Sequence, residues 1–172
     1  NGDEAWYGST TLDLLAGRKT SLTTPTGNLL HAFYFAPHLL LHSLLPPSIM
    51  LLRIPALLSG LAALLVNYVL CCRVFDRRTA LLSTWILALL PVNIAYSRFG
   101  WDASQTLLAA TLVTYSCVLL LRDDASPGAW KWAALALCAA VMVHPTNVFL
   151  IPLFAVPLWS WLRPLLPHVS PR

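Results

Sequence analysis

The sequence predicts an all-α membrane protein, a polytopic bundle of about five spanning helices with one further helix lying on the membrane surface. Of the 172 residues, 58% are hydrophobic and only 10% are charged, whereas a soluble domain carries about a quarter charged residues. Four runs contain no Asp, Glu, Lys or Arg: 54–72, 79–97, 103–121 and 132–162. Each is close to or longer than the roughly 20 residues that a helix needs to cross a bilayer. Backbone groups surrounded by lipid must be bonded inside the segment, so these runs are expected to be helices.

The order of the elements follows from the apolar stretches and the charged links between them. Residues 1–28 form a polar, threonine-rich segment in which we expect short helical pieces around 5–16. Six apolar stretches follow: 29–45, 48–75, 79–98, 103–121, 130–144 and 147–163. Charged links at 73–78 and 122–131 separate the second stretch from the third and the fourth from the fifth. We therefore expect residues 1–47 to lie outside the bilayer core and 48–163 to supply the spanning helices.

The first apolar stretch, 29–45, has the pattern of a helix that lies in the membrane plane. It is short, contains Pro37 and ends before two prolines. At about 100° per residue, four polar side chains share one stripe with leucines elsewhere: Asn28, His31, His38 and His42. A polar face opposite an apolar face favours the interfacial placement, with a spanning helix as the alternative. No carboxylate shares the stripe, so a simple polar face is favoured over a metal site.

The last two stretches are expected to form two short helices. A single helix over 132–162 would be about 46 Å long, against a bilayer core of about 30 Å. The sequence from His144 to Asn147 contains Pro145, which removes a backbone hydrogen bond and clashes with the preceding turn. One long, kinked helix is the alternative.

Basic residues in the links predict the orientation. Five of them flank the 73–78 and 122–131 links: Arg73, Arg77, Arg78, Arg122 and Lys131. The positive-inside rule places both links in the cytoplasm, and so places residues 98–102 and 144–147 outside. If 29–45 lies on the membrane, the amino-terminal segment is external as well. This topology gathers the acids Asp3, Glu4 and Asp102 at the external face.

These external acids and bases are the candidate site residues. Asp3 and Glu4 are adjacent in a chain that has only seven acidic residues, and Asp102 follows a glycine and a tryptophan. A solvated pair at Asp3–Glu4 and an N-cap at Asp102 are the simpler interpretations. Arg53 and Arg98 could be interface anchors or could hold a lipid phosphate.

Several motifs together resemble the GT-C superfamily of membrane glycosyltransferases. They are Gly2-Asp3-Glu4-Ala5-Trp6-Tyr7, Leu52-Arg53-Ile54-Pro55-Ala56-Leu57-Leu58-Ser59-Gly60, Arg73-Val74-Phe75-Asp76-Arg77-Arg78-Thr79-Ala80 and Ser97-Arg98-Phe99-Gly100-Trp101-Asp102. They are most similar to protein O-mannosyltransferases and bacterial aminoarabinose transferases, and the order of motifs extends over almost the whole chain. The resemblance implies one partial GT-C membrane domain over 1–172, lacking a first transmembrane helix that precedes the acidic loop. In relatives, later helices and a carboxy-terminal domain complete the site, so the resemblance also implies that the fragment alone is inactive.

The resemblance also implies the chemistry and the site residues. It implies a polyprenyl-phosphate sugar donor, a lipid, glycan or protein acceptor, and inversion at an external, periplasmic face of the bacterial inner membrane. Asp3 matches the general base, and Glu4 and Asp102 match acids that position the acceptor or a divalent metal ion, the one cofactor left open. Four further residues are expected to bind substrate: Tyr7, Arg53, Arg98 and His144. Thr24 stands where some relatives have a lysine before proline, which leaves the phosphate ligand open.

The alternatives are a transporter or channel module and a structural membrane subunit, in which Asp3, Glu4 and Asp102 could all be replaced by alanine without loss of function. The formal charge of +4 does not indicate nucleic-acid binding, because the basic residues lie in membrane-flanking links; membrane lipids are the expected partners. A transporter or channel module would carry charges within its spanning segments. The runs at 54–72, 79–97 and 103–121 have none, which favours the glycosyltransferase.

Overall fold

The computed structural model describes the chain except for residues 1, 22, 25–26, 28–31, 123–125 and 164–172. The elements are α1 (Gly2–Leu15), α2 (Ala32–Leu44), α3 (Ile49–Val74), α4 (Arg77–Leu89), α5 (Pro91–Tyr96), η1 (Asp102–Gln105), α6 (Thr106–Leu120), α7 (Pro127–Val143), η2 (Pro145–Phe154) and α8 (Ala155–Leu162). The part of the chain that is described contains helices and no strand element, which confirms the all-α class.

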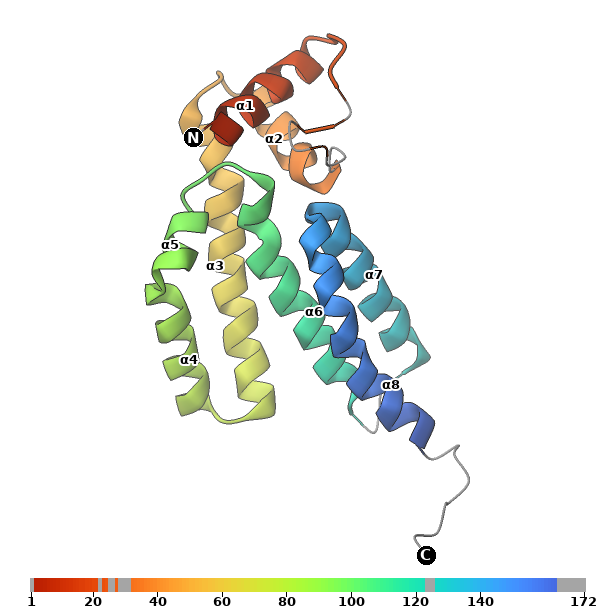
Figure 1. Ribbon diagram of the computed structural model, residues 1–172. Coiled ribbons are helices and arrows are strands. Elements are labelled where there is room, and N and C mark those ends of the chain that lie inside the picture. Colours follow the sequence, from red (N-terminus) through yellow and green to blue (C-terminus); the bar gives the residue numbers. More distant parts are fainter. Residues whose placement is uncertain (1, 22, 25–26, 28–31, 123–125, 164–172) are drawn as a thin grey trace, which may run out of the picture.

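The helices run up and down beside one another, with α1 and α2 at one end (Figure 1). Three helical segments are long and apolar enough to cross a membrane: Ile49–Val74, Asp102–Leu120 and Pro145–Leu162. The α4–α5 segment and the shorter apolar α7 also run between the two ends of the bundle (Figure 1). This arrangement is the membrane helix bundle that the sequence predicts.

Prolines and polar caps set the helix boundaries. The Ser48 hydroxyl accepts the Leu51 N–H at the start of α3, and Asp76 caps α4. Pro91 starts α5 and separates it from α4, because proline cannot continue the hydrogen bonding of the preceding helix. His144 and Pro145 separate α7 from η2, and the two segments fold back against each other (Figure 1). The break predicted at 144–147 is confirmed, and the alternative of one kinked helix is wrong.

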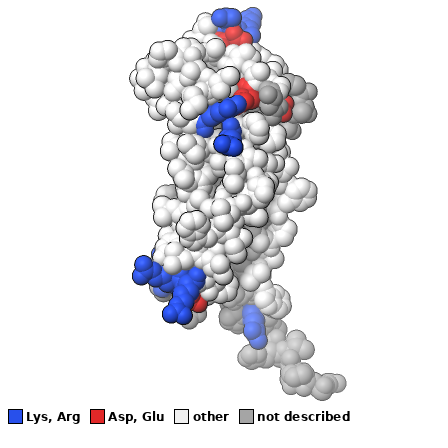
Figure 2. All heavy atoms as spheres, turned by 90° about the vertical axis from the view of Figure 1, so that its left-hand side faces the viewer, with Lys and Arg blue, Asp and Glu red and all other residues white. Residues whose placement is uncertain are grey.

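Charged side chains gather toward the two ends of the bundle, and the band between them, formed by the apolar helices, shows none on this face (Figure 2). The turn between α3 and α4 lies at the same end as the end of α6 and the start of α7 (Figure 1). At the other end are α1, α2, the start of η1 and the α7–η2 junction. The basic links therefore lie together, as predicted, and the three candidate acids lie together at the opposite end.

The described part of the polar stripe of α2 faces the rest of the protein, with His38 buried and His42 half-buried. His38 is fully buried, with Nδ1 2.7 Å from the Tyr34 carbonyl oxygen and Nε2 3.1 Å from the Leu52 carbonyl oxygen. Burial lowers the pKa of His38, and a neutral ring has a single N–H to donate. Phe33, Leu40 and Leu44 are exposed instead, as suits a helix whose outer side meets lipid. Asn28 and His31 lie outside the described residues.

Two glycines bring the segment between α5 and η1 against α3. A Cβ at Gly100 would lie 2.6 Å from the Leu52 carbonyl oxygen and 2.7 Å from Leu52 Cγ. A Cβ at Gly60 would meet Ser97, with the Ser97 Cβ at 3.1 Å. Both distances to Leu52 are far below ordinary contact distances, so only glycine at position 100 allows this approach.

We expect Gly100→Ala to destabilise the protein. The added methyl group meets backbone, which cannot rotate away, and overpacking of this kind costs about 1–3 kcal/mol. The measurement is thermal unfolding of the full-length protein in detergent. Gly128→Ala is the matched control, because its Cβ would meet an ordinary contact at 3.5 Å. An unchanged unfolding temperature for Gly100→Ala would show that this segment does not pack on α3 as described.

Candidate functional site

An aromatic cluster holds α1 against α2 at the end of the bundle. Tyr7, Tyr34 and Phe35 form a buried core cluster, with ring centroids 4.6 Å apart for Tyr7 and Tyr34 and 5.7 Å apart for Tyr7 and Phe35. Trp6 and Trp101 pack against it. Because Tyr7 comes from α1 and Trp101 directly precedes η1, this cluster places the first turn of α1 beside the start of η1.

Glu4 joins α1 to α3 and to the segment before η1. Arg53 Nε donates to Glu4 Oε1 at 2.7 Å, and Arg53 Nη2 donates to Oε2 at 2.9 Å. The Gly100 N–H donates to the same Oε1 at 3.1 Å. The Glu4 side chain is 8% exposed, and the Arg53 guanidinium is the main cause that holds the pKa of Glu4 below its usual range. Both carboxylate oxygens are therefore engaged by protein groups.

Besides burial, the negative charges of Asp102 and Asp3 both raise the pKa of the Tyr7 hydroxyl. Tyr7 is 5% exposed, and its hydroxyl lies near the Asp102 carboxylate. Burial is the main cause that raises the pKa of Tyr7, followed by the negative charge of Asp102 and, more weakly, that of Asp3. The Tyr7 hydroxyl thus stays protonated. Asp3 lies one turn before Tyr7 on α1 and is exposed.

Asp102 is also bonded to its own helix start and approached by His144. Its Oδ1 accepts the Ala103 N–H at 2.8 Å, so Asp102 satisfies a backbone group at the start of η1, a role like that of the predicted cap. His144 Nε2 lies 4.0 Å from Asp102 Oδ2. His144 Nδ1 accepts the Thr146 N–H at 3.3 Å and lies 2.7 Å from the Thr146 hydroxyl. Since Nδ1 accepts, the neutral ring carries its proton on Nε2, which faces Asp102.

The two arginines predicted to bind substrate differ in their surroundings. Arg53 is held by Glu4, as described. Arg98 is exposed at the end of α5, and among the described residues no acidic side chain forms an ion pair with it. The structure therefore leaves Arg98, rather than Arg53, with a guanidinium available to an external anion.

Sequence reasoning did not identify Gly100 or Tyr34 as parts of this site. Gly100 contributes a backbone N–H, which has no sequence signature. The Tyr34 hydroxyl is one of three buried side-chain polar atoms without a hydrogen-bond partner in the described structure; the others are Trp101 Nε1 and Thr106 Oγ1. The aromatic character of the 33–35 segment was visible, but which ring would face Tyr7 was not.

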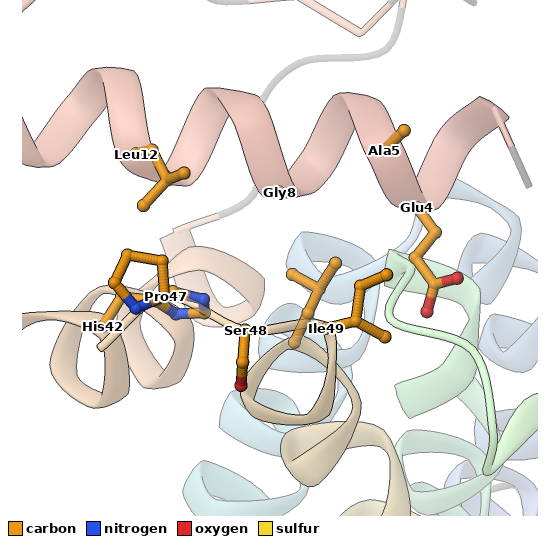
Figure 3. Close-up of a pocket in the computed structure, with 9 residues that line it drawn as sticks. Glu4, Ala5, Gly8, Leu12, His42, Pro47, Ser48 and Ile49 are labelled. Atoms are coloured by element: carbon orange, nitrogen blue, oxygen red, sulfur yellow. The ribbon is translucent and has the colours of Figure 1, made fainter. Parts of the chain in front are cut away.

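A groove of about 380 Å³ lies between α1 and the start of α3. Figure 3 shows Glu4 at one end of it and His42 at the other. Between them it is lined mainly by small or apolar side chains: Ala5, Gly8, Leu12, Pro47, Ser48, Ile49 and Leu52. Because its one carboxylate is already paired with Arg53, the groove suits an apolar chain better than a charged group.

Metal binding at Glu4 and Asp102 remains a prediction that these residues do not favour. Arg53 and the Gly100 N–H already occupy three of the roughly four acceptor positions of the Glu4 carboxylate, two on Oε1 and one on Oε2. Within the described residues, no three His, Cys, Asp or Glu side chains form a group that could hold a metal ion.

Comparison with known proteins gives one family match. The family described as dolichyl-phosphate-mannose-protein mannosyltransferase matches residues 32–170, which is more than half of the chain. The match includes Arg53, Arg98, Asp102 and His144 and begins after α1, so Asp3, Glu4 and Tyr7 precede it. No curated protein and no solved structure gives a significant match to the chain.

The ion pair of Glu4 predicts how stability depends on pH. Because the pKa of Glu4 is lowered in the folded protein, the pair stabilises it fully above the ordinary glutamate pKa of 4.5. This contribution is lost as the pH falls through the lowered pKa of the folded state. We expect wild type to unfold at a higher temperature than Glu4→Gln near neutral pH, with the difference shrinking in acid.

Asp13→Asn is the control for this measurement, because the Asp13–Arg18 pair is exposed and such pairs contribute about 0–1 kcal/mol. A difference between wild type and Glu4→Gln that stays constant into acid would contradict the role assigned to the Glu4 charge.

Proposed function

The chain belongs to the dolichyl-phosphate-mannose-protein mannosyltransferase family, and on this premise we propose that Asp3 and Asp102 serve an inverting sugar transfer from a polyprenyl-phosphate donor to an acceptor hydroxyl. Family membership at the coarse level makes the chain part of an integral membrane glycosyltransferase that uses a lipid-linked sugar donor. The donor's exact carrier, the inversion and the external face are our proposals. The observation that supports the proposal is that Trp101, next to Asp102, packs against the aromatic cluster of Tyr7, which brings Asp102 to the part of α1 that carries Asp3.

In the proposed reaction, Asp3 is the general base. It is the exposed member of the acidic pair, so an acceptor can reach it, whereas Glu4 is buried and paired. The acceptor oxygen attacks the anomeric carbon from the face opposite the phosphate, through an oxocarbenium-like state. The bond to the phosphate oxygen breaks, the carrier leaves as polyprenyl phosphate, and the acceptor proton passes to Asp3. No step runs through a metal ion.

Asp102, Tyr7 and His144 support this step in the proposal. The Tyr7 hydroxyl lies near the Asp102 carboxylate, and His144 Nε2 lies 4.0 Å from Asp102 Oδ2. Glu4 is a positioning residue, because Arg53 and Gly100 occupy it. The available guanidinium of Arg98 is our candidate for the donor phosphate.

Asp3→Asn in the full-length protein tests the base assignment. General base catalysis contributes about 10²–10⁴-fold, so we expect kcat to fall by that factor while the KM for acceptor changes little. The measurement is sugar transfer from a purified lipid-linked donor. Asp13→Asn is the matched control, since Asp13 lies in the same helix and pairs with Arg18. Near-normal transfer by Asp3→Asn would remove Asp3 from the chemistry.

The proposed external face is tested separately by labelling in intact cells. We expect a cysteine at position 3 to react with a membrane-impermeant maleimide added outside. A cysteine at position 77, at the opposite end of the bundle, should react only after the membrane is permeabilised. The reverse pattern would place the proposed site in the cytoplasm and exclude an external reaction.

A further inference from the structure

The turn between α3 and α4, residues 73–78, carries three exposed arginines at the end of the bundle opposite the candidate site. Arg73 lies in the last turn of α3, and Arg77 and Arg78 begin α4. A group of basic side chains borders the apolar band at this end (Figure 2). The Arg73 guanidinium lies over the Tyr115 ring, 5.1 Å from its centroid, which ties this part of the turn to α6.

The acid in this turn does not pair with the arginines. Asp76 Oδ1 accepts the Arg78 N–H at 2.7 Å and the Thr79 N–H at 2.9 Å, and Oδ2 accepts the Thr79 hydroxyl at 3.0 Å. These hydrogen bonds, those from Thr79 first, lower the pKa of Asp76, so the carboxylate stays ionised as the helix cap. Within the described residues, Arg73, Arg77 and Arg78 form no ion pair with an acidic side chain. The turn therefore presents positive charge outward.

Apolar side chains in the same turn are exposed as well. Val74 is 46% exposed and Phe75 is 65% exposed, and they stand between Arg73 and Asp76. At the same end of the bundle, α7 exposes Lys131 and Trp132. An exposed phenyl ring flanked by cations is unfavourable in water. It is favourable at the bilayer boundary, where rings enter the acyl region and cations stay at the headgroups.

We propose that the 73–78 turn is a binding site for anionic phospholipid headgroups. The arginines bind the headgroup phosphate, for which the guanidinium is well shaped, and Phe75 enters the acyl layer beside the same lipid. The negative charge of the lipid supplies the anion that Asp76 does not provide, because Asp76 is held by the backbone. This inference concerns the end of the bundle away from Asp3 and does not depend on the proposed sugar transfer.

Thermal unfolding of the detergent-purified full-length protein tests the proposal, with short-chain phosphatidylglycerol compared with phosphatidylcholine. A ligand that binds the native state raises the unfolding temperature. We expect phosphatidylglycerol to raise it more, and we expect added salt to reduce the excess. Arg77→Gln/Arg78→Gln should lower the apparent affinity for phosphatidylglycerol about 25-fold, since each arginine near an anionic surface contributes about fivefold. Arg77→Lys/Arg78→Lys keeps the charge and should retain most of the preference.

The charge-matched control is Arg18→Gln/Lys19→Gln, at the other end of the molecule, which should keep the full preference. Inorganic phosphate should give no comparable stabilisation, because it lacks an acyl chain to contact Phe75. Three results would overturn the proposal: equal stabilisation by the two lipids, an equal loss in the control, or an equal effect of inorganic phosphate. If Arg77→Gln/Arg78→Gln does not fold, an unaltered lipid preference in the single variant Arg77→Gln and in Phe75→Ala would equally contradict it.

Discussion

The contact among Glu4, Arg53 and the Gly100 N–H is the point on which the geometry of the candidate site depends. One carboxylate from α1 binds a guanidinium from α3 and a backbone group from the segment that leads into η1. The neighbouring residue of Arg53 adds the third connection, because the Leu52 carbonyl oxygen lies against His38 of α2. Two consecutive residues near the start of α3, Leu52 and Arg53, therefore contact α2 and α1, and Glu4 of α1 in turn binds the segment before η1. Removing the Arg53 charge would leave the Glu4 carboxylate, which is 8% exposed, without its main partner, whereas the Arg53 side chain is 39% exposed and reaches water without Glu4.

This anchoring explains why two neighbouring acids can have different roles. Successive residues of a helix point about 100° apart. Because the Glu4 side chain points toward Arg53 of α3, the Asp3 side chain points away from that contact, one turn before Tyr7. The aromatic cluster of Tyr7, Tyr34 and Phe35 then fixes how far α1 can turn. The breaks at Pro91 and Pro145 complete the arrangement, because the segments that carry Asp102 and His144 then lie at the end of the bundle where α1 packs.

Much of the fold could be predicted from the sequence, because lipid requires long apolar helices and proline ends them. The runs at 54–72 and 103–121 became α3 and α6, and the 144–147 break lies where it was expected. Which side of each helix faces the lipid and which faces the other helices was harder to predict. The α2 histidines follow a helical period, but a period does not say which side meets lipid, and His38 proved to be buried. The partners of Glu4 could not be predicted either, because Arg53 is 49 residues away in the sequence and the Gly100 N–H belongs to the backbone, which has no sequence signature.

The three-way contact at Glu4 has a direction that an ordinary ion pair lacks. In a pair made of two side chains alone, exchanging acid and base between the helices preserves the attraction. Here the Gly100 N–H also points at the α1 side chain, and a backbone donor needs an acceptor. If the two charges were exchanged by Glu4→Arg and Arg53→Glu, the guanidinium at position 4 and the Gly100 N–H would both be donors and could not bond to each other. The Gly100 N–H therefore requires the acid to come from α1 and the base from α3. Exchanging the two charges would not restore the stability that either single substitution removes.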